Sequence, residues 1–229
     1  MNKESINICN KINQIELSIK KYENIRVYLT GYGPFMNVIN NPSEILVNHI
    51  YLNKQLISFK LNNKVSFECF NIMDVNCKFV SNNLPYIWNK VKGNTNSKEM
   101  KLIIHFGVNE NILNPILNLE TSAKNYINEY TETGLKGKIV ENLPEDYILK
   151  TKLNIVEIKR RMKDYSINSD DAGNYLCNYV YFNSLINLDN IKDSYCQFIH
   201  IPSLKVLNIQ TIMDFFVIYL ESLISIYCI

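Results

Sequence analysis

The chain has few of the residues that mark zinc sites, disulfide scaffolds or nucleic-acid-binding surfaces. Its 229 residues include three histidines and six cysteines, and no two cysteines have CxxC spacing. The sequence therefore predicts neither a structural zinc site nor a disulfide framework, and we expect no metal and no cofactor. The net charge of +2 gives no large basic field, which makes nucleic acid a poor partner on electrostatic grounds.

Long apolar runs are also missing. Residues 1–26 contain no continuous apolar segment of the kind that a secretory signal requires, so we expect a cytoplasmic protein. The most apolar stretch, 215–229, is shorter than the roughly 20 residues that span a bilayer, and Glu221 interrupts it. This stretch therefore predicts a terminal helix docked on the protein, and no membrane partner is expected.

Short apolar runs alternate with amphipathic stretches of helical length. Strands are expected at 26–30, 65–72, 101–107, 165–168 and 196–202, and helices near 41, 77, 155, 174 and 208. Asn41, Pro42 and Glu44 mark one helix start as a cap, a first-position proline and a capping-box carboxylate. The alternation predicts an α/β protein with a mainly parallel sheet, as one domain over 25–229 after an N-terminal extension over 1–24.

The residues with useful chemistry follow the predicted strands, which is where open α/β sheets bind their ligands. Cys177 comes after the turn 170–173 and near the start of a predicted helix, where N–H groups and partial positive charge favour a thiolate. His200 and His105 each lie near a strand end, and spacing alone does not choose between them. With Glu120 as a carboxylate, these are the parts of a Cys-His-acid hydrolase.

Each candidate also has a purely structural interpretation. A cysteine on an aromatic-rich helix is most often a small core residue, and a lone glutamate is most often solvated. The turn 31–35 lacks the third glycine of a dinucleotide loop and the Gly-Lys-Ser/Thr of a phosphate loop, so neither nucleotide site is expected. Tyr32 and Phe35 in this turn instead suit the apolar wall of a small ligand pocket.

Four blocks of the sequence, taken in order, resemble the pyroglutamyl peptidase I family, the family C15 cysteine peptidases that remove N-terminal pyroglutamate. The blocks are TGYGPF at 30–35 with NPS at 41–43, HFGV at 105–108 with ETSAKN at 120–125, SDDAGNYLCN at 169–178 and FIHIP at 198–202. The resemblance covers roughly residues 25 to 220 and is that of a divergent, eukaryotic-like member. It implies a three-layer α/β/α sandwich with an open, twisted sheet.

The resemblance also implies a role for each block. Cys177 would be the nucleophile that forms a thioester, His200 its proton carrier and Glu120 the acid that orients the imidazole, while His105 would lie outside this triad. The implied substrate-binding residues are Tyr32, Phe35, Val108 and Leu176. The expected partners are N-terminally pyroglutamylated peptides, and the sequence is compatible with either a monomer or a homo-oligomer.

Two segments depart from the family pattern. Residues 108–118 form a longer and bulkier connection where many members have a Gly-rich turn, and 128–134 contain no arginine where bacterial members carry one. Both segments would lie in the walls of the substrate site. Two alternatives therefore stay open: cleavage of another acyl amide, and a catalytically silent homologue that binds pyroglutamyl-like termini.

Overall fold

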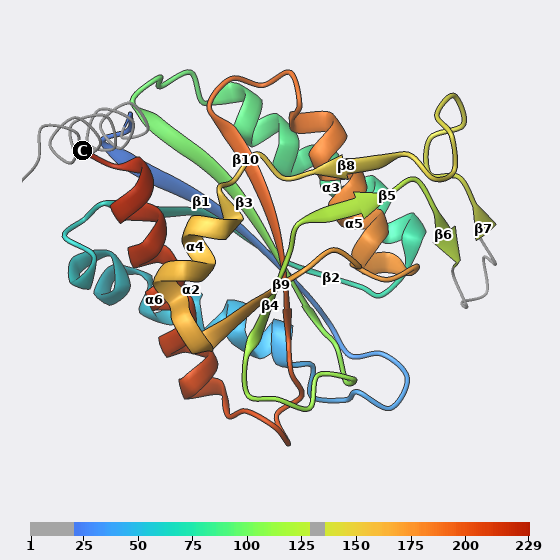
Figure 1. Ribbon diagram of the computed structural model, residues 1–229, viewed down its shortest axis with the longest axis horizontal. Coiled ribbons are helices and arrows are strands. Elements are labelled where there is room, and N and C mark those ends of the chain that lie inside the picture. The colour runs from blue at the N-terminus through green and yellow to red at the C-terminus, as the bar shows by residue number, and fades with distance from the viewer. Residues whose placement is uncertain (1–20, 129–135) are drawn as a thin grey trace, which may run out of the picture.

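A six-stranded sheet forms the middle layer of the computed structural model, which describes residues 21–128 and 136–229 (Figure 1). The strands stand in the order β2-β1-β3-β10-β4-β9. Their bounds are β1 Asn24–Tyr32, β2 Val65–Met73, β3 Glu99–Val108, β4 Leu117–Glu120, β9 Ser166–Ser169 and β10 Ser194–Ile201. β1, β2, β3 and β10 are parallel, whereas the short β4 and β9 run the other way. The prediction of a mainly parallel sheet is confirmed.

Helices cover both faces of the sheet, which completes the expected α/β/α sandwich (Figure 1). On one face lie α2 (Pro42–Lys60), α4 (Ile155–Met162) and α6 (Ile209–Tyr227). On the other face lie α3 (Cys77–Gly93) and α5 (Leu176–Leu188). Side chains of β10 alternate between these layers, since Phe198 packs under α3 and α5 while Ile199 packs under α2 and α6.

Asparagine caps begin four of the five α-helices in the described part of the chain. Backbone N–H groups of the first turn donate to the side chains of Asn41, Asn76, Asn154 and Asn208. Asn41 and Pro42 begin α2 as predicted, with Glu44 in the first turn. α5 differs, because Tyr175 at its cap position makes no side-chain cap hydrogen bond. The first N–H groups of α5 therefore have no capping side chain.

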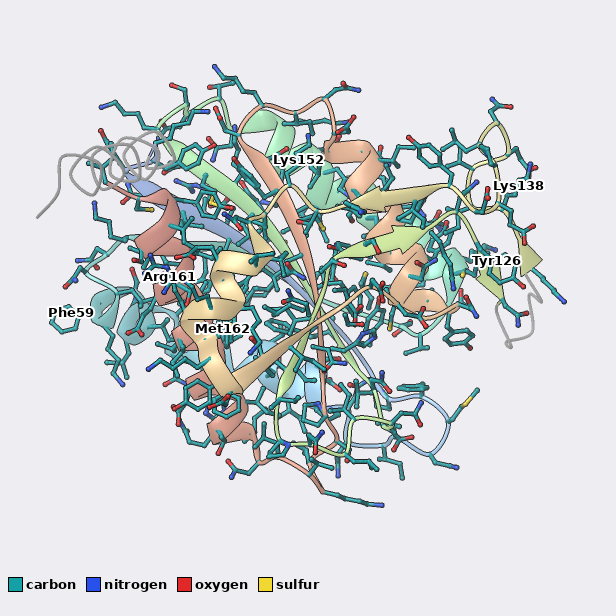
Figure 2. All side chains as sticks on the ribbon, viewed as in Figure 1. Phe59, Tyr126, Lys138, Lys152, Arg161 and Met162 are labelled. Atoms are coloured by element: carbon teal, nitrogen blue, oxygen red, sulfur yellow. The ribbon has the colours of Figure 1, made fainter. Side chains whose placement is uncertain are left out.

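The C-terminal helix α6 is long and apolar enough to span a membrane by length and hydropathy alone. In the structure it docks on the sheet, as the sequence predicts. Its fully buried side chains include Ile212, Phe216, Tyr219 and Leu223. α4 lies against α6, where Met162 is buried and Arg161 donates to Ser225 at 2.6 Å (Figure 2).

The sequence did not predict β4 or the four short strands beside α5. These are β5 (Ser122–Lys124), β6 (Ile127–Asn128), β7 (Lys136–Gly137) and β8 (Ile148–Lys150), in which β5 pairs with β8 and β6 with β7 (Figure 1). The buried Asn125 fastens this region, because its side chain hydrogen-bonds to backbone groups within 139–144. Strands of two or three residues carry too little alternation to be found from sequence.

The predicted domain boundary between residues 24 and 25 stays a prediction. Most of the extension 1–24 lies outside the described residues, which begin at residue 21. The arginine-free segment 128–134 also lies outside them except for its first residue.

Candidate active site

The turn after β1 is fastened to the start of α2. The Asn41 side chain donates to the carbonyl oxygen of Gly33 at 2.9 Å, and the Ser43 hydroxyl accepts from the N–H of Tyr32 at 2.9 Å. A Cβ on Gly31 would lie 2.6 Å from the carbonyl oxygen of Ser43, so this close approach requires glycine. The two segments of the first block, 30–35 and 41–43, therefore form one unit that fixes Tyr32 at the carboxyl end of β1.

β4 brings Glu120 to His200. The strand pairs antiparallel with β10, with Glu120 opposite Phe198 and Asn118 opposite His200. Oε1 of Glu120 lies 2.7 Å from Nδ1 of His200, and both side chains are buried. Oε2 of Glu120 has no hydrogen-bond partner among the described residues. The imidazole of His200 is therefore the hydrogen-bond partner of this carboxylate.

Cys177 lies in the first turn of α5, directly after the Asp-Asp-Ala-Gly turn. Gly173 in that turn has a φ of 86°, which glycine adopts without strain. A Cβ on Gly107 of β3 would lie 3.0 Å from Sγ of Cys177 and 2.8 Å from the ring of Phe198. Gly107 thus leaves the space in which the thiol lies. Cys177 is half-buried, whereas the other cysteines of the described residues are buried.

Asn178 ties the segment after Glu120 to the start of α5. Its side-chain oxygen accepts from the N–H of Lys124 at 2.9 Å. Its amide nitrogen donates to the carbonyl oxygens of Lys124 and Tyr126 at 2.8 and 2.7 Å. The residue next to Cys177 therefore fixes the position of the cysteine relative to the glutamate block.

His200 interacts with both Cys177 and Glu120. Burial lowers the pKa of its imidazole, but a hydrogen bond and a charge interaction with Cys177, followed by those with Glu120, raise it from 6.5 to about 10. The imidazolium form is therefore favoured at neutral pH. Glu120, His200 and Cys177 make one continuous chain of interactions, from a buried carboxylate to a half-buried thiol.

His105, the rival histidine, lies in a different environment. Its Nδ1 is 2.7 Å from the Thr30 hydroxyl and its Nε2 is 2.9 Å from the Ser184 hydroxyl, so both ring nitrogens have partners. Full burial lowers the pKa of the imidazole from 6.5 to about 3. His105 is therefore a neutral core residue that links β1, β3 and α5.

We expect His105→Leu to flatten the acid side of the stability profile. In the wild type the folded-state pKa of His105 lies below the unfolded value, so its contribution is present above pH 6.5 and is lost as the pH falls toward about 3. Urea unfolding at several pH values measures the slope. Equal slopes in the variant and the wild type would contradict a neutral, buried His105.

An apolar pocket lies beside Cys177. About 290 Å³ of empty space lies within it, and that figure includes open solvent at its mouth. Cys177 lines it, and so do all four residues named as substrate-binding: Tyr32, Phe35, Val108 and Leu176. None of the described side chains that line it is charged. The structure therefore brings the thiol and these four residues together, while their role in binding stays a prediction.

Sequence reasoning missed three residues of the pocket wall. Val75 follows β2, and inspection beyond that strand end would have found it. Asn41 was interpreted only as a helix cap, and Tyr175 only as part of the cysteine block. The space at Gly107 had no sequence signal, because it depends on how α5 crosses β3.

We expect Gly107→Ala to displace the thiol and to lower stability by about 1–3 kcal/mol, because the new methyl group would overlap the Phe198 ring and Sγ of Cys177. The alkylation rate of Cys177 and thermal unfolding measure the two effects. Gly93→Ala is the matched control, since nothing lies within 4 Å of a Cβ built there. Wild-type alkylation and stability in Gly107→Ala would show that the thiol does not depend on this space.

The fold and the site together define an α/β/α protein with a Cys-His-Glu chain beside a small apolar pocket. No family model and no curated protein sequence matches the chain. Solved structures do match it, and they are pyrrolidone carboxyl peptidases, also called pyroglutamyl peptidases. The fold is therefore the pyrrolidone carboxyl peptidase fold, and the resemblance inferred from the four sequence blocks is confirmed at that level.

Three of these structures illustrate the similarity. A mutant enzyme from Pyrococcus furiosus has a TM-score of 0.68 at 20% identity, covering 86% of this chain and 97% of its own. The Thermus thermophilus enzyme has a TM-score of 0.66 at 21% identity, covering 86% of this chain and 99% of its own. Pyroglutamyl peptidase I from Bacillus amyloliquefaciens has a TM-score of 0.68 at 18% identity, covering 90% of this chain and 98% of its own.

Proposed function

We propose that this protein is a cysteine peptidase that hydrolyses the amide bond after an N-terminal pyroglutamate. The observation that carries the proposal is the chain from Glu120 through His200 to Cys177, which ends at the apolar pocket. A nucleophile, a base and an orienting acid within hydrogen-bond reach are the parts that covalent hydrolases use. The shared fold with pyrrolidone carboxyl peptidases supports the same assignment.

In the acylation step, Sγ of Cys177 attacks the carbonyl carbon of the pyroglutamyl group, and the C=O electron pair moves to oxygen. The C–N bond then breaks, and the imidazolium of His200 gives its proton to the departing amine. The product is a thioester between Cys177 and the pyroglutamyl group. Glu120 stabilises the imidazolium before this transfer and holds Nδ1 in place.

The start of α5 suits the oxyanion of the tetrahedral intermediate. The N–H groups of its first turn have no capping side chain, unlike those of the four asparagine-capped helices in the described residues. They also carry the partial positive charge of a helix N-terminus. One well-placed donor of this kind is worth about 3–4 kcal/mol of transition-state stabilisation.

In deacylation His200 acts as a base, whereas in acylation it gave its proton to the departing amine. Formation of the thioester removes the free thiol group of Cys177, whose interaction helps to raise the pKa of His200, so that pKa falls. Neutral imidazole then takes a proton from water as the water oxygen attacks the thioester. The C–S bond breaks, pyroglutamate leaves, and the thiolate–imidazolium pair is restored.

The apolar lining of the pocket favours a neutral ring as the acyl group of the substrate. A pyrrolidone ring has an amide nitrogen and no charge, which matches a small pocket with no charged residue among its described lining side chains. An ordinary N-terminal amine would enter this pocket charged, and the thiolate of Cys177 is already paired with the imidazolium of His200. The desolvation cost would favour pyroglutamyl peptides over unmodified ones.

The direct test is release of the fluorophore from pyroglutamyl-aminomethylcoumarin by the purified protein in reducing buffer. We expect turnover that iodoacetamide stops as it modifies Cys177. Prolyl-aminomethylcoumarin, which has the same ring size and a charged amine, is the matched substrate control. An absence of pyroglutamyl release by folded protein would reject the proposed activity.

One observation favours a second candidate, a hydrolase of the same mechanism with another acyl group. Val108 lines the pocket and belongs to the segment 108–118 that departs from the family pattern. Rapid alkylation of Cys177 without pyroglutamyl release would favour this candidate. Alkylation of Cys177 no faster than that of the buried cysteines would instead favour a catalytically silent homologue.

A further inference from the structure

Among the described residues that line the pocket beside Cys177, Tyr32 has a side-chain hydroxyl whose hydrogen bonding the fold leaves incomplete. Asn41 also lines the pocket, but its amide donates to Gly33 and its oxygen accepts from Ser43. The Tyr32 side chain is 3% exposed, and its hydroxyl has no hydrogen-bond partner among the described residues. A buried hydroxyl without a partner is disfavoured, so such a group needs an explanation.

The position of Tyr32 links this hydroxyl to the reacting end of the pocket. The turn after β1 is held by Asn41 and Ser43, so the tyrosine has little freedom to find another partner. Its phenol is close enough to Cys177 for a charge interaction. Burial, followed by this interaction, keeps the pKa of the phenol well above 10, so the group is a neutral donor and acceptor.

We propose that the Tyr32 hydroxyl is the hydrogen-bond partner of the ring amide of the bound acyl group, and that it selects neutral lactam rings over rings without an amide. This inference rests on the proposed function, because it assigns the specificity of the same site. A lactam offers one C=O and one N–H, and a phenol pairs with either. The apolar wall side chains Phe35, Val75, Val108 and Leu176 would contact the ring carbons.

The hydroxyl is shielded in the empty pocket, so the ligand must displace the wall slightly to reach it. Side-chain shifts of this kind are common when ligands bind, and hydrogen bonds of an active site often tighten only in the complex. The shielding of the Tyr32 hydroxyl from water also explains why the pocket would select lactam rings. A ring that enters without an amide leaves the hydroxyl unpaired, whereas a lactam satisfies it.

Protection of Cys177 from iodoacetamide by 2-pyrrolidone tests the inference without any turnover. Three proteins are compared: the wild type, Tyr32→Phe and Tyr219→Phe. Tyr219 is the matched control, because its hydroxyl is also buried without a partner, but it lies on α6 in the other helix layer. Mass spectrometry gives the alkylation rate of Cys177 at each 2-pyrrolidone concentration.

We expect the 2-pyrrolidone concentration that halves the alkylation rate to rise about 10-fold or more in Tyr32→Phe, and to stay unchanged in Tyr219→Phe. The alkylation rate without 2-pyrrolidone is measured for each protein and is the reference for that protein's own protection curve. Equal protection of wild type and Tyr32→Phe, equal weakening in both variants, or no protection of the wild type would each overturn the inference.

Thermal unfolding separates a binding role from a structural one. Because the hydroxyl has no partner in the folded protein, Tyr32→Phe should unfold at the same temperature as the wild type or at a higher one. A clearly lower unfolding temperature would show that the hydroxyl supports the fold, and would overturn the inference.

Turnover measurements distinguish a failure of the role proposed for Tyr32 from a failure of the proposed reaction. If the wild type cleaves pyroglutamyl-aminomethylcoumarin but 2-pyrrolidone protects both proteins equally, the function stands and the role of Tyr32 fails. If 2-pyrrolidone protects the wild type at least 10-fold better and no turnover occurs, the role of Tyr32 stands and the proposed reaction fails.

Discussion

Cys177→Ala is expected to lower pyroglutamyl-aminomethylcoumarin turnover by about 10⁴-fold or more, because covalent catalysis ends when the attacking atom is removed. The fold should be retained, since Cys177 is half-buried and alanine fits helix α5. Turnover is measured beside circular dichroism and thermal unfolding. Cys177→Ser keeps the size of the side chain and should be nearly as inactive.

Cys69→Ala is the matched control for this variant. It removes the same sulfur from a cysteine on β2, the edge strand, which does not line the pocket. Its turnover should equal that of the wild type. A Cys177→Ala protein that retained turnover would remove Cys177 from the role of nucleophile and would refute the acyl-enzyme route.

Glu120→Gln is expected to lower kcat by about 10³-fold, because the imidazolium of His200 loses its anionic partner. The pH profile should change as well. Interaction with Glu120 helps to raise the pKa of His200 to about 10, so its loss lowers that pKa. Since His200 must be protonated to release the amine, the alkaline limb of kcat/KM should move to lower pH.

The pH profile distinguishes this role from a general loss of structure. A destabilised protein would lose activity at all pH values in proportion, without a shift of the alkaline limb. Glu110→Gln is the control, because Glu110 is an exposed carboxylate on the connection that follows β3. An unchanged alkaline limb in Glu120→Gln would show that the carboxylate does not set the protonation of His200.

Long helices and strands with a clear hydrophobic periodicity could be predicted from the sequence. The strand near 196–202 and the helix after the Asp-Asp-Ala-Gly turn lie where expected, because a buried β10 and a glycine-containing turn leave local signals. β4 has only four residues, so its Leu-Asn-Leu-Glu alternation was too short to decide between strand and loop. Its pairing with β10 depends on the tertiary fold and leaves no signal in the local sequence.

The parts of the site could be identified from the sequence, but not their mutual geometry. The residue types of Cys177, His200 and Glu120 indicated a hydrolase, and the family resemblance chose His200 over His105. Only the structure shows that both ring nitrogens of His105 already have hydroxyl partners. The buried, unpaired hydroxyl of Tyr32 likewise follows from packing, which no local pattern records.

The placement of β10 between β3 and β4 has a consequence for when the candidate site is assembled during folding. His200 and Glu120 are 80 residues apart in the sequence and meet only when β10 has paired with β4. We expect such a contact to form late, because the loop-closure entropy must be spent before a non-local contact stabilises the chain. A chain that has completed only its local helices and the β1–β2–β3 unit therefore has a thiol but no proton carrier beside it. The Glu120–His200–Cys177 chain is therefore complete only when the whole sheet has formed.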